Sequence, residues 1–265
     1  MAAQRGRPWT RVLSLTVLIL AFVATVGAST GDKLPEFQNC LKHIITNKRM
    51  TSGLSVEQFY GKWPFYRFLG MQEPFSVLFS LGNLWAHWDG WKKVRAQIPK
   101  SYSMLPFYEW LAGIGVASWV FSSIFHTRDF RITEELDYFG AGASVLYGLY
   151  YTTVRVFRLD KRTPRRRTVL RCWTLVCVFL YICHVSYLKF IHWDYTYNMA
   201  ANVAAGIGQN ALWTWFSVDR YRKSRRIWAA WPGFVVAWVI FAMSMELFDF
   251  PLGWVALMPT ACGIS

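Results

Sequence analysis

The chain has 265 residues, of which 54% are hydrophobic and 18% aromatic, and its net charge is +14 from 29 Lys and Arg against 15 Asp and Glu. Fifteen Trp and 20 Phe are too many for an ordinary soluble domain of this length, and long apolar runs alternate with short basic loops, so we expect an integral membrane protein. Because the basic residues lie mostly between the apolar runs, membrane topology explains the charge better than nucleic-acid binding does, and no nucleic-acid partner is expected.

The first 28 residues are predicted to form a cleaved signal peptide. Three arginines precede an apolar run from Val12 to Val26, and Gly27 and Ala28 supply small residues before Ser29. The alternative is an uncleaved first transmembrane helix, for which this run is short compared with the ~20 residues that span a bilayer. Both interpretations place the chain after Ser29 in the lumen. We expect residues 29–69 to form a short lumenal segment and residues 70–265 to form a transmembrane helix bundle.

This bundle is expected to be all-α and polytopic, with six spanning helices over residues 70–91, 105–126, 136–156, 168–188, 197–217 and 227–247. The loops between these helices alternate in charge. Residues 92–100, 158–167 and 220–226 are basic, so the positive-inside rule predicts that these three loops lie in the cytosol. The near-neutral loop over residues 127–135 then faces the lumen, in agreement with the predicted signal peptide.

Three polar residues lie beside this lumenal loop and form the candidate site. Ser122 and His126 are four residues apart and share one face of a helix, and Asp137 begins the next apolar segment. The histidine could bind a metal ion while the serine and the aspartate orient a metal-bound water. It could instead act as a base for a serine nucleophile, with the aspartate holding the imidazole. A purely structural helix-capping role is the third interpretation, and His87, His184 and His192 fit structural roles better than ligand roles.

Several motifs in order resemble the PER-one-like family, and the resemblance extends from about residue 59 to Pro251. The matching segments are Phe59-Tyr60-Gly61-Lys62-Trp63-Pro64-Phe65, Phe125-His126-Thr127-Arg128-Asp129, Asp137-Tyr138-Phe139, His184-Val185-Ser186-Tyr187-Leu188 and Asp194-Tyr195 with Tyr197-Asn198. Taken together these motifs are very specific.

The resemblance implies a lumenal enzyme of the endoplasmic reticulum membrane or the Golgi membrane that remodels glycosylphosphatidylinositol (GPI) anchors. Such an enzyme removes the sn-2 acyl chain of the anchor lipid after attachment to protein, so its partners are GPI-anchored proteins, their anchor lipid and membrane lipid. The family belongs to a wider superfamily of seven-helix metal hydrolases with alkaline ceramidases and adiponectin receptors. By this resemblance Ser122 and Asp137 are catalytic, and His126 is a ligand of Zn2+.

The chain departs from the family pattern in two places. The segment Asp249-Phe250-Pro251 is present, but no histidine follows His192, whereas the family carries a His-x-x-x-His motif on a seventh helix. A cysteine-rich lumenal block is also missing after Cys40. These differences suggest an alternative or mispredicted transcript. Because a catalytic zinc usually has three protein ligands, the second hypothesis is a catalytically inactive truncated relative or a membrane scaffold, and a third is a metal-handling or transport protein.

Overall fold

The computed structural model describes residues 68–161 and 163–247. Within these residues the chain is helical, and the extended pairing is limited to one isolated bridge between Phe68 and Met71. The all-α prediction is therefore confirmed for the described residues. The predicted signal peptide and most of the predicted lumenal segment lie outside them.

Six long helices follow one another along the described chain: α3 (Pro74–Gln97), α4 (Leu105–Thr127), α5 (Arg131–Phe157), α6 (Pro164–Ser186), α7 (Tyr195–Ser224) and α8 (Trp231–Leu247). A π-helix, η2 (Tyr187–Ile191), continues α6, and a 3-10 turn, η3 (Ile227–Ala230), precedes α8. Each long helix matches one of the six predicted from apolar runs, with ends that differ by up to several residues.

The helix ends extend beyond the apolar runs because polar side chains support extra turns. Asp89 pairs with Lys93 at 2.7 Å and keeps α3 helical through its basic end. At the start of α5, Thr133 Oγ1 accepts a hydrogen bond of 2.9 Å from the Phe130 backbone N–H. The Asp194 side chain caps α7 by accepting a hydrogen bond of 3.0 Å from the Tyr197 backbone N–H.

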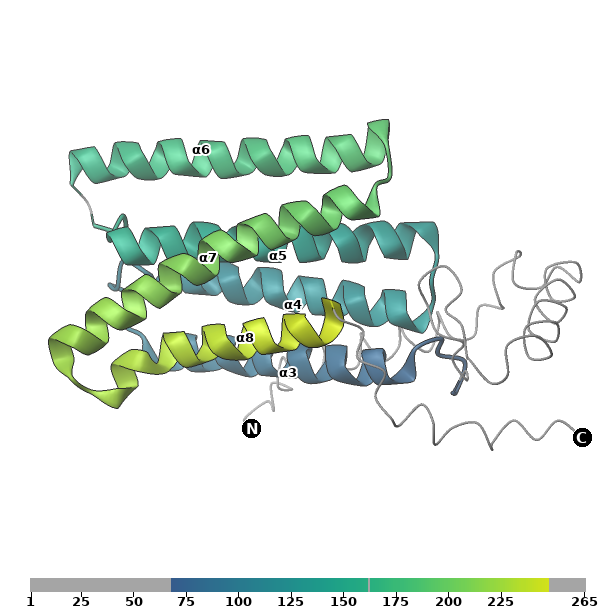
Figure 1. Ribbon diagram of the computed structural model, residues 1–265, viewed down its shortest axis with the longest axis horizontal. Coiled ribbons are helices and arrows are strands. Elements are labelled where there is room, and N and C mark those ends of the chain that lie inside the picture. Colours follow the sequence, from purple (N-terminus) through teal and green to yellow (C-terminus); the bar gives the residue numbers. More distant parts are fainter. Residues whose placement is uncertain (1–67, 162, 248–265) are drawn as a thin grey trace, which may run out of the picture. The chain divides into compact units, whose positions relative to one another are not determined.

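The chain divides into two compact units. Within the described residues, the first unit contains α3, α4, α5 up to Tyr147, the end of α6 from Val178, and η2. Figure 1 shows α3 and α4 side by side in this unit, and they pack along their length. The close approach requires Gly115, since a Cβ there would lie 2.2 Å from Cδ2 of His87. This unit contains the candidate site.

The second unit contains the rest of α5 and α6 together with α7, η3 and α8. Ser217 on α7 ties this unit together, because its hydroxyl donates to the Ala229 carbonyl at 3.3 Å and accepts from the Gly233 N–H at 3.2 Å. Tyr150 and Thr174 join α5 to α6 through a hydroxyl–hydroxyl hydrogen bond of 3.0 Å.

One candidate membrane span is found by length and hydropathy among the described helices, and it covers Pro164–Ile191, which is α6 with η2. The apolar stretch Ile227–Ala242 is shorter. The expectation of six spanning helices therefore stays a prediction.

Candidate active site

The last two turns of α4 present the serine and the histidine that the sequence singled out. Ser122 is buried, with 8% of its surface exposed, and the side chain of His126 is 24% exposed. The histidine lies at the C-terminal end of α4, where the helix dipole favours a positive charge.

The imidazole of His126 is held by a carboxylate from another helix. Nδ1 of His126 lies 2.7 Å from Oε2 of Glu73, the residue that precedes Pro74 at the start of α3. The Glu73 side chain makes no capping hydrogen bond to its own helix. The same oxygen accepts a hydrogen bond of 3.3 Å from the Ser76 hydroxyl. A carboxylate in this position fixes the orientation of the ring and leaves Nε2 as the nitrogen available for chemistry.

Backbone hydrogen bonds keep Glu73 beside His126. The Glu73 N–H donates to the His126 carbonyl at 3.0 Å, and the Gln72 N–H donates to the Thr127 carbonyl at 3.2 Å. These two carbonyls end α4 and have no partner within their own helix. Oε1 of Gln72 also accepts from the Asp129 N–H at 2.6 Å. The segment before α3 is thus fastened to the C-terminus of α4, so the backbone itself holds Glu73 beside His126.

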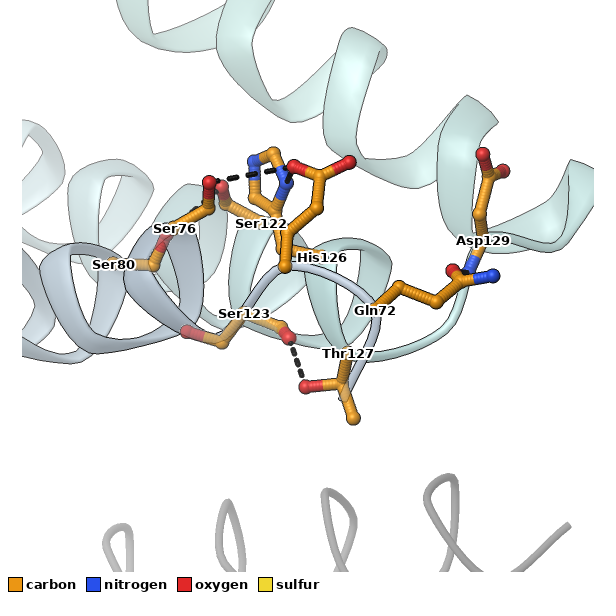
Figure 2. A network of polar contacts seen from close by, with 9 residues as sticks. Gln72, Ser76, Ser80, Ser122, Ser123, His126, Thr127 and Asp129 are labelled. Atoms are coloured by element: carbon orange, nitrogen blue, oxygen red, sulfur yellow. Dashed lines mark hydrogen bonds and ion pairs between the residues drawn. The ribbon is translucent and has the colours of Figure 1, made fainter. Parts of the chain in front are cut away.

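A second group of polar contacts surrounds Ser122. Its hydroxyl lies 3.1 Å from the hydroxyl of Ser80, one turn beyond Ser76 on α3. Figure 2 shows Ser76 and Ser80 facing Ser122 and His126 across the contact between α3 and α4. The carboxyl group of Asp137, near the start of α5, interacts with the Ser122 hydroxyl and with the charges of His126 and Glu73.

The structure thus brings Ser122, His126 and Asp137 into one polar cluster with Glu73 and Ser80. In one interpretation from sequence, Asp137 was expected to hold the imidazole. In the structure Glu73 takes that position, and Asp137 interacts with the serine. The catalytic roles of the three residues stay a prediction. Sequence reasoning missed Glu73, although an acidic residue just before the helix that precedes the histidine was a signal that it could have used.

An ion pair stands beside this cluster, at the same end of α5. Glu135 is buried and accepts from Lys189 of η2 at 2.5 Å and from Arg131 at 3.3 Å. The hydrogen bond from Lys189 lowers the pKa of the Glu135 carboxyl group below its ordinary value, against the opposing effect of burial. The pair fastens η2 to the start of α5, two residues before Asp137.

A zinc ion would need more ligands than the described cluster supplies. Among residues 68–161 and 163–247, no group of three or more His, Cys, Asp or Glu side chains could hold a metal ion. A catalytic zinc site usually has three protein ligands, and the cluster offers one imidazole whose Nδ1 already pairs with Glu73. The described residues alone do not fit the ion, and zinc stays a prediction from the sequence resemblance.

Comparisons with known proteins agree with the sequence motifs. The profile of the Per1-like family matches residues 37–257. The protein PER1 homolog of Schizosaccharomyces pombe is 44% identical over 270 residues, which cover 87% of this chain and 80% of the relative. The GPI-specific phospholipase A2-like PGAP3 of Bos taurus is 38% identical over 280 residues, covering 90% and 85%. Post-GPI attachment to proteins factor 3 of Drosophila melanogaster is 37% identical over 286 residues, covering 91% and 86%. No solved structure matches the chain significantly.

Proposed function

Because the chain belongs to the Per1-like family, we propose that it remodels the lipid of GPI anchors by hydrolysing an acyl ester, the one at the sn-2 position, after the anchor has been attached to protein. The substrates are GPI-anchored proteins, and the product left on the protein is a lyso-form of the anchor. The names of several relatives, which describe a GPI-specific phospholipase A2-like protein, support this proposal.

The observation that carries the proposal is the carboxylate–imidazole pair of Glu73 and His126 beside the hydroxyl of Ser122. Ester hydrolysis needs a base that takes a proton from the attacking water and returns it to the leaving oxygen. With Nδ1 held by Glu73, Nε2 of His126 can accept that proton. Glu73 then stabilises the positive charge that develops on the ring.

Ser122 and Asp137 serve the carbonyl side of the reaction. The Ser122 hydroxyl has Ser80 and Asp137 as neighbours, and these partners set the direction of its proton. In our proposal this hydroxyl orients the ester, while water adds to the carbonyl carbon. The bond between the acyl carbon and the glycerol oxygen then breaks, His126 returns the proton to that oxygen, and a fatty acid and an alcohol result. Every step uses groups of the chain itself and a water molecule.

We also propose that the long helices span the membrane of the endoplasmic reticulum or the Golgi and that the cluster lies at the lumenal face. The alternating charge of the loops supports this orientation. Large apolar side chains are exposed on the long helices, including Phe79, Trp110, Leu175, Trp215 and Trp238, as expected where helices meet lipid. The loop between α4 and α5, beside His126, would then be accessible from the lumen.

The test is to express the full chain in cells that lack their own Per1-like protein. Mass spectrometry of the anchor lipids on a GPI-anchored reporter measures how much unremodelled sn-2 chain persists. We expect the wild-type chain to restore remodelling and His126→Ala to abolish it. Ser123→Ala is the matched control, because Ser123 is the adjacent serine on α4 and its hydroxyl bonds to the Trp119 carbonyl rather than to the cluster. If the original sn-2 acyl chain persists on the reporter although the wild-type protein is present at normal levels, the result would instead support the hypothesis of an inactive relative or a scaffold.

A further inference from the structure

A groove of about 270 Å³ lies in the first unit, between α4 and the first half of α5. Ile114, Ala117 and Phe121 line it from α4, Gly140 and Ala143 line it from α5, and Tyr181 closes one wall. The lining is almost wholly apolar and carries no charged side chain, and the groove is open along one side. These features suit a flexible hydrocarbon chain better than a polar ligand.

The groove begins where the polar cluster ends. Ser118, which lines the groove, precedes Ser122 by one helical turn, and Gly140 follows Asp137 by about one turn. Residues spaced in this way share a helix face. An ester whose carbonyl group lies at Ser122 and Asp137 would therefore have the apolar groove directly beside its acyl side.

Small residues and one hydrogen bond maintain this shape. A Cβ at Gly140 would lie 3.0 Å from Cδ2 of Phe121 and 3.4 Å from the Ser118 backbone, so glycine permits the close approach of α5 to α4. The Tyr181 hydroxyl donates to the Phe139 carbonyl at 3.0 Å, which holds the Tyr181 ring against the groove. The groove is thus a fixed part of the first unit.

We propose that this groove binds the acyl chain whose ester bond the Ser122–His126 cluster cleaves. The inference rests on the proposed function and extends it to selectivity for the length of the acyl chain. On each helix the lining residues span eight positions, from 114 to 121 and from 136 to 143, and the seven steps between the first and the last cover about 10 Å at the helical rise. An extended polypeptide backbone advances about 3.6 Å per residue, which is three bonds, or about 1.2 Å per bond. An extended acyl chain advances by a similar length per bond, so the groove accepts about eight carbons. Longer chains continue through the open side into lipid.

The test incubates the purified full-length protein in detergent micelles with phosphatidylinositols that carry an acetyl, an octanoyl or a palmitoyl group at sn-2. The rate of hydrolysis of each lipid is measured as released acid by mass spectrometry. Wild-type protein should prefer octanoyl over acetyl and treat octanoyl and palmitoyl alike. Ala143→Phe and Ala117→Phe place a ring in the groove, and each should lower hydrolysis of the two longer chains by about tenfold or more and leave acetyl hydrolysis within about twofold.

Ala141→Phe is the matched control, because Ala141 is exposed on α5 and does not line the groove. It should leave hydrolysis of all three lipids unchanged. Equal losses for short and long chains in both groove variants, or no loss in either, would overturn the role of the groove while the proposed hydrolysis stands. Failure of the wild-type chain to cleave any of the lipids, including a GPI lipid added as a fourth substrate, would refute the proposed function and the groove's role with it.

Discussion

The replacement Glu73→Gln tests the carboxylate–imidazole pair most specifically. The amide keeps the shape of the side chain and still offers an oxygen to Nδ1 of His126, but it removes the negative charge at 2.7 Å. The two side chains are only 15% and 24% exposed, so water screens the pair weakly. A hydrogen bond to a charged group contributes about 1.5–3 kcal/mol and a neutral one about 0.5–1.5 kcal/mol.

The difference, about 1–2 kcal/mol, should appear in the transition state, where the imidazole becomes positive. We therefore expect Glu73→Gln to lower kcat by about 5- to 30-fold and to leave KM nearly unchanged, measured as acid release by the purified chain under saturating lipid. Ser76→Ala is the control, because the Ser76 hydroxyl contacts the same carboxylate oxygen at 3.3 Å and carries no charge. A Glu73→Gln rate within twofold of wild type, or an equal loss in Ser76→Ala, would refute the assignment of Glu73.

Two further predictions concern the unit that carries the site. Gly115→Ala should destabilise the protein by about 1–3 kcal/mol, because the new Cβ would lie 2.2 Å from Cδ2 of His87. In Gly82→Ala the new Cβ meets nothing within 4 Å, so this change should be neutral or stabilising. Thermal melting in detergent compares the two variants. Equal melting temperatures would contradict the packing of α3 on α4. The hydrogen bond from Lys189 lowers the pKa of Glu135 in the folded protein. The pair should therefore stabilise the protein at pH values above the ordinary carboxyl pKa of about 4.3. This contribution should be lost as the pH falls through the lowered pKa. Lys189→Met should therefore melt below wild type at pH 7, and the difference should shrink below pH ~4; a difference that does not depend on pH would contradict this reasoning.

Much of the fold could be predicted from the sequence because apolar runs determine where long helices form. The runs at 105–126 and 227–247 match α4 and α8 closely. The predictions were less accurate where charged residues continue a helix beyond its apolar part, as at the end of α3 and the end of α7. There, local pairs such as Asp89 with Lys93 and Asp219 with Lys223 support the extra turns, and hydropathy does not detect them.

The site could be predicted only in part, for a physical reason that Glu73 illustrates. Ser122 and His126 are one turn apart, so helical geometry alone places them on one face. Glu73 is 53 residues away from its partner His126, and only the packing of α3 on α4 brings the two together. The same packing turns Ser80 toward Ser122. The groove likewise depends on how closely α5 approaches α4 at Gly140, which no local pattern in the sequence specifies.

The most direct test of ester hydrolysis at this cluster uses water enriched in oxygen-18. Purified chain is incubated in this water with a GPI-anchored protein, and the released fatty acid is analysed by mass spectrometry. The account predicts a fatty acid that carries one labelled oxygen, together with a rate that falls by about 10²- to 10⁴-fold in His126→Ala. Release of fatty acid at the same rate by His126→Ala, or no release by the wild-type chain, would contradict it.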